Sequence, residues 1–128
     1  MWDPTTWVEV DHEHRIYGND QASIWAIVDE EDYHWFVQWR WTAKVSRGGK
    51  KIYLFRPAYA GGARRRSIYL HVEIMKRTGI EPPSAVHGIT DHRNGNSLDC
   101  RRRNLRWATR SMNRRNIFGS MGYDLIEG

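Results

Sequence analysis

Short blocks of hydrophobic residues, separated by turn-forming residues, run along the chain and predict small elements. Residues 23–28 read Ser-Ile-Trp-Ala-Ile-Val, a β-branched and aromatic run that favours a strand. Residues 39–45 and 51–56 are two further strand candidates. Gly48-Gly49 between them indicates a hairpin, because glycine tolerates the positive φ that tight turns need.

Two short helices are predicted within the first 80 residues. Asp29 is a candidate N-cap, and Asp32 follows three residues later in an arrangement like a capping box. Phe36 then lies on the apolar face of this helix. Residues 70–77 suit a second helix of about two turns, and Gly79 is a plausible residue to end it.

Residues 86–117 predict a strand, a loop, a second strand and a helix, in that order. The first strand covers residues 86–91, and Asn94-Gly95 then forms a tight turn, since this dipeptide tolerates positive φ best. Residues 105–109 form the returning strand. Thr109 or Ser111 caps the following helix.

These elements predict an α+β fold. Its first part, residues 1–80, is a small β-rich region with short helices. Its second part, residues 81–120, is the strand-loop-strand-helix unit, and residues 121–128 form a tail. A chain of 128 residues is long enough for one compact domain of this kind.

Charge is unevenly distributed between the two halves of the chain. Residues 1–60 contain seven basic and nine acidic side chains, a balance of −2, whereas residues 61–128 contain thirteen and six, a balance of +7. A basic half that also contains many amide side chains indicates nucleic acid more than membrane as the partner. A basic face that only meets solvent is the common alternative.

Cys100 is the only cysteine, which excludes an internal disulfide and a zinc site built from two or more cysteines. It suits a reducing compartment.

No run approaches the ~18 apolar residues of a membrane span. We therefore expect a cytoplasmic protein with no membrane association. The group His12-Glu13-His14 is interpreted as an exposed polar segment and not as a metal cluster.

Asp91 and His92 begin a set of residues suited to phosphodiester hydrolysis. That reaction needs an activated water and charge neutralisation on the phosphate. A histidine with a pKa near ~6.5 takes a proton from water at neutral pH, whereas carboxylate and amide oxygens suit magnesium or manganese. Asn113 is placed to share such an ion with Asp91. The amide of Asn104 is placed to tie down the loop that carries His92.

The same segment resembles the HNH endonuclease family, of the phage and intron-homing type. The matching residues are Asp91-His92, Asn94-Gly95-Asn96, Leu98-Asp99, Arg101, Asn104-Leu105-Arg106 and Asn113. Because Asn113 stands in the third position, the chain is similar to the His-Asn-Asn variant. A weaker resemblance extends upstream to about residue 26 and includes Tyr69-Leu70-His71.

The resemblance implies a ββα-metal unit that binds one divalent cation, most simply magnesium or manganese. It implies that His92 is the general base, that Asp91 and Asn113 ligate the metal, and that Asn104 orients the His92 loop. It further implies cleavage of double-stranded DNA to a 5′-phosphate and a 3′-hydroxyl, in the cytoplasm of a bacterial or phage-infected cell. Many relatives add a DNA-recognition module after the catalytic helix, so a separate recognition or assembly partner protein is a further expectation.

Arginines surround the motif and are the candidates for contact with DNA phosphates. They are Arg64, Arg65, Arg66, Arg93, Arg101, Arg102, Arg103, Arg106, Arg110, Arg114 and Arg115. The first three are expected in a loop.

Two functions from different classes remain open on the sequence alone. The first is a metal-dependent DNA endonuclease, a nickase if the chain acts as a monomer. The second is a DNA-binding module or subunit on the same scaffold that does not cut. The intact Asp-His-Asn-Asn set favours the first. An RNA-binding basic domain is a weaker third interpretation, because no RNA-recognition motif of the usual kinds is present.

Overall fold

The computed structural model describes residues 14–18, 21–46, 48–49 and 51–118. Its elements are β1 (His14–Gly18), β2 (Gln21–Val28), α2 (Glu30–Phe36), β3 (Thr42–Val45), β4 (Ile52–Ala60), β5 (Ala63–Tyr69), α3 (Leu70–Arg77), β6 (Ile89–His92), the 3₁₀ turn η1 (Arg102–Asn104), β7 (Leu105–Ala108) and α4 (Arg110–Phe118). The sequence interpretation of His12-Glu13-His14 as an exposed polar segment falls mostly outside these residues, since only His14 is described.

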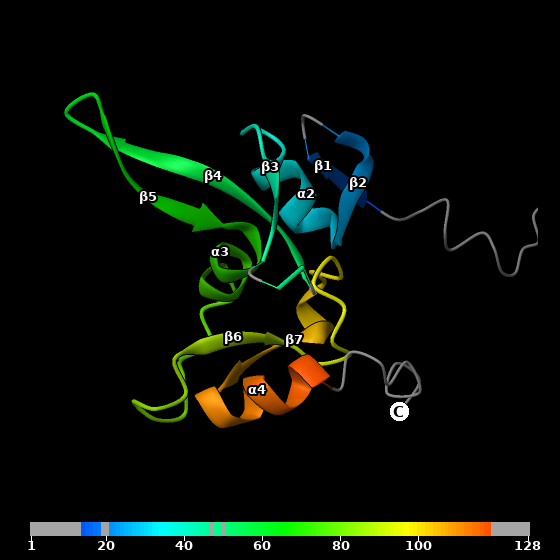
Figure 1. Cartoon of the computed structure of the whole chain (residues 1–128), viewed down its shortest axis with the longest axis vertical. Helices are drawn as coiled ribbons and strands as arrows, with labels where there is room; N and C mark the ends of the chain where they lie inside the picture. The colour runs from blue at the N-terminus through cyan, green and yellow to red at the C-terminus, as the bar shows by residue number, and fades with distance from the viewer. Residues whose placement is uncertain (1–13, 19–20, 47, 50, 119–128) are drawn as a thin grey trace, which may run out of the picture.

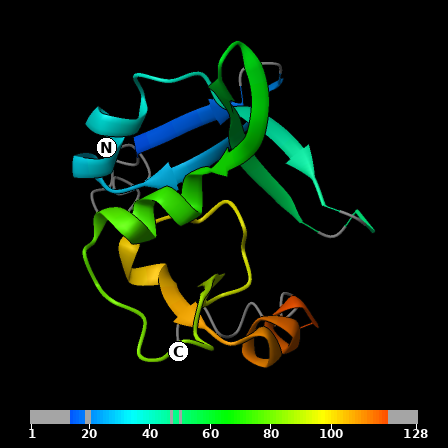
Figure 2. The ribbon, with the colours of Figure 1, turned by 90° about the vertical axis from the view of Figure 1, so that its left-hand side faces the viewer.

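Within the described residues, three small antiparallel sheets, with strand orders β1-β2, β3-β4-β5 and β6-β7, combine with three α-helices. The α+β class predicted from the sequence is therefore confirmed. In Figures 1 and 2 strands β1 to β5 lie on one side of α3, and β6, β7 and α4 lie on the other. Helix α3 contacts strands of both groups.

Two of the strand predictions need correction. The run 39–45 is extended only from Thr42, because residues after α2 form a turn in which Trp41 Nε1 donates a hydrogen bond to the carbonyl oxygen of Phe36 (2.8 Å). The first strand of the later hairpin begins at Ile89 and not at Val86. Val86 lies outside the strand because it belongs to a local turn, in which Ser84 Oγ accepts a hydrogen bond from Val86 N.

The prediction of a loop at residues 64–66 is wrong. Gly61 and Gly62, with φ of 61° and 83°, form a two-residue turn, and the chain returns at once as β5. Arg64 pairs with Tyr59 and Arg66 with Ala58. Two consecutive residues with positive φ match the right-handed twist of the flanking strands, so the arginines lie on a long hairpin that projects from the body (Figure 1).

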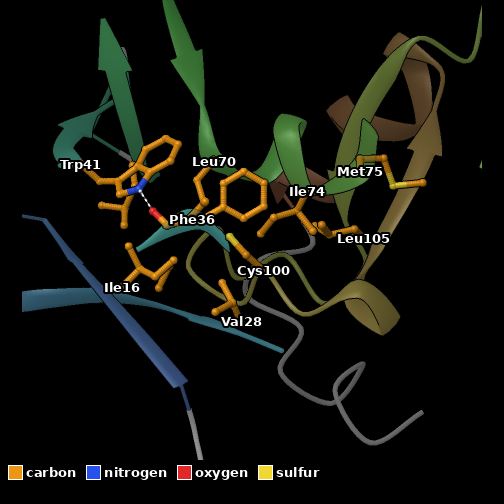
Figure 3. Close-up of a cluster of buried hydrophobic side chains, with 11 residues drawn as sticks. Ile16, Val28, Phe36, Trp41, Leu70, Ile74, Met75, Cys100 and Leu105 are labelled. Carbon is orange, nitrogen blue, oxygen red and sulfur yellow. Dashed lines mark hydrogen bonds between the residues drawn. The ribbon is translucent and has the colours of Figure 1, made fainter. Parts of the chain in front are cut away.

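The hydrophobic core is a single cluster that takes residues from both predicted parts of the chain (Figure 3). Its members are Ile16, Ala26, Val28, Phe36, Trp41, Leu54, Leu70, Ile74, Met75, Cys100 and Leu105. Cys100 and Leu105 belong to the hairpin unit, whereas the other members belong to β1, β2, β4, α2, α3 and the turn after α2. Burial of this shared apolar surface holds the two parts against each other.

The capping-box prediction at Asp29 and Asp32 is wrong, because neither carboxylate caps α2. Asp29 is the N-cap residue but makes no side-chain cap hydrogen bond; its Oδ2 accepts a hydrogen bond from the backbone N of Arg102 (2.8 Å). The Asp32 side chain is fully buried and accepts two hydrogen bonds of 2.9 Å from the Arg102 guanidinium. Arg77 lies 3.4 Å from the same carboxylate.

The loop between β6 and β7 is joined to the N-terminal sheets at two more points. Ile27 N donates to the carbonyl oxygen of Leu98, and Cys100 N donates to that of Ile27, both at 2.8 Å. Ser97 Oγ donates to the carbonyl oxygen of Ile52 (2.6 Å) and accepts from Ile52 N (3.2 Å). The hairpin loop is therefore fixed by backbone bonds as well as by the ion pair.

Replacing Arg102 should destabilise the whole fold, because it leaves the buried Asp32 carboxylate with only the more distant Arg77. We expect Arg102→Met to lower the free energy of unfolding by about 3 kcal/mol, near the lower end of values for broken buried ion pairs. Urea unfolding followed by tryptophan fluorescence measures this. The matched control is Arg103→Met, an exposed neighbour, which should change stability by less than about 0.5 kcal/mol. Equal effects of the two substitutions would contradict this account.

Candidate active site

Asp91 and His92 end strand β6 and are almost fully buried, at 3% and 6% exposure. In the register of the hairpin, Asp91 faces Arg106 and His92 faces Leu105. The chain turns immediately afterwards: Gly95 has φ of 79°, and its N donates to the carbonyl oxygen of His92 (2.9 Å). The glycine thus makes the tight turn that was predicted for it.

Asn104 holds this loop through both ends of its amide. Its Oδ1 accepts a hydrogen bond from Asn94 N (3.1 Å), and its Nδ2 donates to the carbonyl oxygen of Asp99 (2.8 Å) and to Asn94 Oδ1 (3.1 Å). Its backbone carbonyl accepts a further bond from Arg93 N (2.6 Å). The amide therefore links the start and the end of the loop that follows His92, as the sequence predicted.

Other side chains of the loop are structural. Asn94 Nδ2 donates to Asp99 Oδ2 (3.1 Å), and Asn96 Oδ1 accepts from Leu98 N (3.0 Å). The Arg101 guanidinium donates two hydrogen bonds to the Asp99 carboxylate, from Nε to Oδ1 (2.8 Å) and from Nη2 to Oδ2 (2.7 Å). Burial alone would raise the pKa of Asp99, but the hydrogen bonds and charge of Arg101 outweigh it and lower that pKa. The carboxylate is therefore charged near neutral pH.

Asn116 contacts Asp91 from the last turn of α4. Its Nδ2 donates to both carboxylate oxygens of Asp91, at 3.2 and 3.1 Å, and to the carbonyl oxygen of His92. Arg106 Nε donates to Asp91 Oδ2 (2.9 Å). Three oxygen atoms thus converge on one point, which the amide nitrogen of Asn116 fills.

By donor chemistry, these three oxygens could hold a divalent cation only in place of the Asn116 amide nitrogen that they now accept from. Carboxylate, main-chain and amide oxygens are the ligands that magnesium and manganese take, with water in the remaining positions. Asp91 would hold the ion, and the predicted ligand Asn113 lines the same small cavity as Asn116. Among the described residues no three His, Cys, Asp or Glu side chains gather in one group, so the amides and the carbonyl of His92 would supply the other protein ligands.

The cavity itself has a volume of about 10 Å³ and is lined by Lys51, Tyr53, Asp91, His92, Gly95, Asn113 and Asn116. That is about the space of a single water molecule. Tyr53 comes from the start of β4, and Lys51 immediately precedes that strand. Lys51 Nζ donates a hydrogen bond to the carbonyl oxygen of Gly95. The N-terminal sheet therefore contributes a cation to the wall of the site.

Burial and the nearby charge of Asp91 shift the pKa values of Lys51 and Tyr53. Burial lowers the pKa of the Lys51 amine, and the negative charge of Asp91 opposes that change. For Tyr53, burial raises the phenol pKa and the charge of Asp91 raises it further. Tyr53 is consequently a neutral hydroxyl at pH 7 beside the carboxylate.

His92 packs against a second histidine, His71, from the first turn of α3, with ring centroids 4.9 Å apart. Tyr53 stacks on His71 at 5.1 Å. Burial lowers the pKa of His71 to about 4. Burial also lowers the pKa of His92 well below its usual value, and the charges of His71 and Lys51 add to this. Both imidazoles are therefore neutral at pH 7, which is the form that accepts a proton.

The arginines predicted to meet DNA fall into two groups. Arg101, Arg102 and Arg106 contact the carboxylates of Asp99, Asp32 and Asp91, so each has a structural partner. Exposed side chains are those of Arg64, Arg66, Arg93, Arg103, Arg110, Arg114 and Arg115. The Arg65 side chain lies outside what the structure describes.

Four residues at the site were missed by the sequence reasoning. Asn116 had a detectable signal, since it follows Asn113 by three residues and so lies on the same face of a helix. Lys51 and Tyr53 alternate on a strand and therefore share a face, but nothing local indicates that this face meets residue 92. His71 was named within the weaker upstream resemblance, and its partner His92 could not be identified from the sequence.

No family model, curated protein or solved structure matches the chain in the comparisons. Within the described residues, no helix is both long and apolar enough to cross a membrane.

Acid should destabilise the fold through His71, because its pKa is about 4 when folded and near ~6.5 when unfolded. The unfolded chain binds the extra proton first. Stability is therefore complete above about pH 6.5 and falls as the pH drops towards 4, by roughly 1–3 kcal/mol.

Urea unfolding measured at steps between pH 7 and pH 4 tests this expectation. His71→Gln should make the pH dependence shallower, the remainder coming from buried His92, whereas His34→Gln, at an exposed histidine on α2, should leave it as in the wild type. A slope that both variants share with the wild type would show that His71 does not titrate as described.

Proposed function

We propose that this protein is a metal-dependent DNA endonuclease of the HNH type, in which β6, β7 and α4 form the ββα-metal unit. The observation that supports this most is geometric: Asp91, His92 and Asn113, from adjacent positions of β6 and from α4, line one small cavity. A base and a cation site next to each other are what phosphodiester hydrolysis requires.

His92 acts as the general base in this proposal. Its Nε2 lies 3.9 Å from Cys100 Sγ; in the tautomer with the proton on Nε2, Nδ1 is the nitrogen that takes a proton from the attacking water. The water oxygen bonds to phosphorus, and the bond from phosphorus to the 3′-oxygen breaks. The products are a 5′-phosphate and a 3′-hydroxyl. Asn104 acts indirectly, by holding the loop that positions His92.

Two positive charges, a bound metal ion and Lys51, would stabilise the negative charge of the phosphate. When bound at Asp91 and an amide oxygen of Asn113 or Asn116, magnesium or manganese supplies Lewis-acid stabilisation of the phosphate and of the leaving oxygen. Lys51 approaches the same cavity from the N-terminal sheet and adds a cation from the protein. A preorganised donor of this kind is typically worth about 100-fold in rate.

Double-stranded DNA is the proposed partner. Arg93, Arg103, Arg110 and Arg114 are exposed around the hairpin and α4, and Arg64 and Arg66 lie on the projecting β4–β5 hairpin. Contacts from such arginines go mainly to phosphates and carry little sequence information. Binding should weaken steeply with salt. Such a nuclease would act in the cytoplasm of a bacterial or phage-infected cell, alone or with a separate recognition protein.

Nicking of supercoiled plasmid tests the function. We expect the wild type to convert plasmid to the open circle with magnesium or manganese, and a chelator to stop the reaction. His92→Ala should lower the rate at least about 100-fold, because the general base is lost. The matched control is His34→Ala, which removes an exposed histidine from α2 and should cut like the wild type.

Lysine variants extend the same assay. Lys51→Ala should slow nicking strongly, whereas Lys76→Ala, an exposed lysine on α3, should not. If plasmid stays intact under every divalent metal while a gel shift shows binding, the protein is a non-cleaving DNA-binding module and the nuclease proposal is wrong.

A further inference from the structure

A second and larger pocket lies beside the candidate active site. It has a volume of about 360 Å³ and is lined by Lys44, Ser46, Tyr53, Tyr69 and His71. Tyr53 lines both cavities, and His71 packs against His92 at 4.9 Å. The pocket is therefore continuous with the residues proposed to cut DNA, although hydrolysis itself makes no use of it.

Aromatic rings form the walls of this pocket. Tyr53 stacks on His71 with centroids 5.1 Å apart, and Tyr69 meets Tyr53 edge to face at 6.1 Å. The rings come from β4, from the end of β5 and from the start of α3, which are packed elements and not loops. Rigid aromatic faces of this kind bind planar groups by stacking, with little preference for one base over another.

Among the described residues that line the pocket, Lys44 is the one that carries a positive charge at neutral pH. Lys44 Nζ donates a hydrogen bond to the hydroxyl of Tyr69 (3.1 Å) and lies 5.7 Å from the ring centroids of both Phe55 and Tyr69. The side chain of Lys44 is exposed, so its charge also reaches solvent. Aromatic walls next to a cation suit a ligand that is planar at one end and anionic at the other.

We propose that this pocket holds one unstacked nucleotide of the strand being cut, next to the scissile phosphate, with its base against Tyr53 and Tyr69 and its phosphate near Lys44. The inference rests on the proposed nuclease function. The volume lies at the low end of small-ligand sites, so it suits one nucleotide. A base inside a duplex presents only its edges, so it must leave the stack to meet these ring faces.

Substrate preference follows from this occupant. A base leaves its stack most easily where it is mismatched or unpaired. The protein should therefore cut a duplex with one unpaired base next to the cleavage position at least tenfold more efficiently, in kcat/KM, than the fully paired duplex. A pocket that plays no part in binding DNA would give equal values.

The first experiment uses the intact protein and 2-aminopurine, a fluorescent base whose emission changes when it unstacks or stacks on a protein ring. It is placed at each position flanking the mapped cut, and a chelator prevents cleavage. We expect one position to change strongly on binding. Tyr69→Leu should abolish that change and raise KM about tenfold, with kcat changed much less.

Two controls match that variant. Tyr69→Phe keeps the aromatic face and should retain the fluorescence change and the preference for the unpaired base. Tyr17→Leu removes a half-exposed tyrosine on β1 and should behave like the wild type. Free deoxynucleoside monophosphate, added as competitor, should compete only at concentrations far above those of DNA.

The outcomes separate this inference from the proposed function. If the wild type cuts paired and unpaired substrates equally and no probe position responds, the pocket inference is overturned and the nuclease stands. Competition by free mononucleotide as strong as that by DNA would also overturn it, in favour of a small-molecule site. If the wild type cuts no DNA, the proposed function fails first. Because the probe signal is read in the intact protein, a variant that fails to fold leaves the test valid.

Discussion

The buried contact between Asp32 and Arg102 is the constraint on which the rest of the structure depends. The Asp32 carboxylate is fully buried in the N-terminal half, and the guanidinium that neutralises it comes from the loop of the β6–β7 hairpin. Removing Arg102 would leave the Asp32 carboxylate in a place where water cannot solvate it. The pair therefore fixes how the hairpin meets the N-terminal sheets, and it is this meeting that brings Lys51, Tyr53 and His71 to His92.

The burial of His92 explains why the loop around it contains so many hydrogen bonds. A buried imidazole stays neutral because charging it there is costly, and a neutral imidazole is the form that a general base needs. The same burial would leave backbone groups of the loop without water, and Asn94 and Asn104 supply their partners. The amides are thus required by the burial of the proposed base, and the loop is rigid for the same reason.

Local patterns were sufficient for the parts of the fold that depend on local interactions. The turn at Asn94-Gly95, the cap at Thr109, whose Oγ1 accepts a hydrogen bond from Met112 N (3.1 Å), and the helix at residues 70–77 follow from backbone preferences. The roles of Asp29 and Asp32 did not, because their partner Arg102 lies about seventy residues away and capping is the cheaper local explanation. The contribution of Lys51 to the site was missed for the same reason.

Mapping the chemistry of the cut ends tests the central claim most directly, namely that the Asp91–His92 hairpin hydrolyses DNA by attack of water with a metal at Asp91. Plasmid nicked by the wild type is purified and treated with DNA ligase, which joins only a 5′-phosphate to a 3′-hydroxyl. The account predicts complete resealing, and no nicked product from Asp91→Asn. Nicks that ligase cannot seal, or equal nicking by Asp91→Asn, would contradict it.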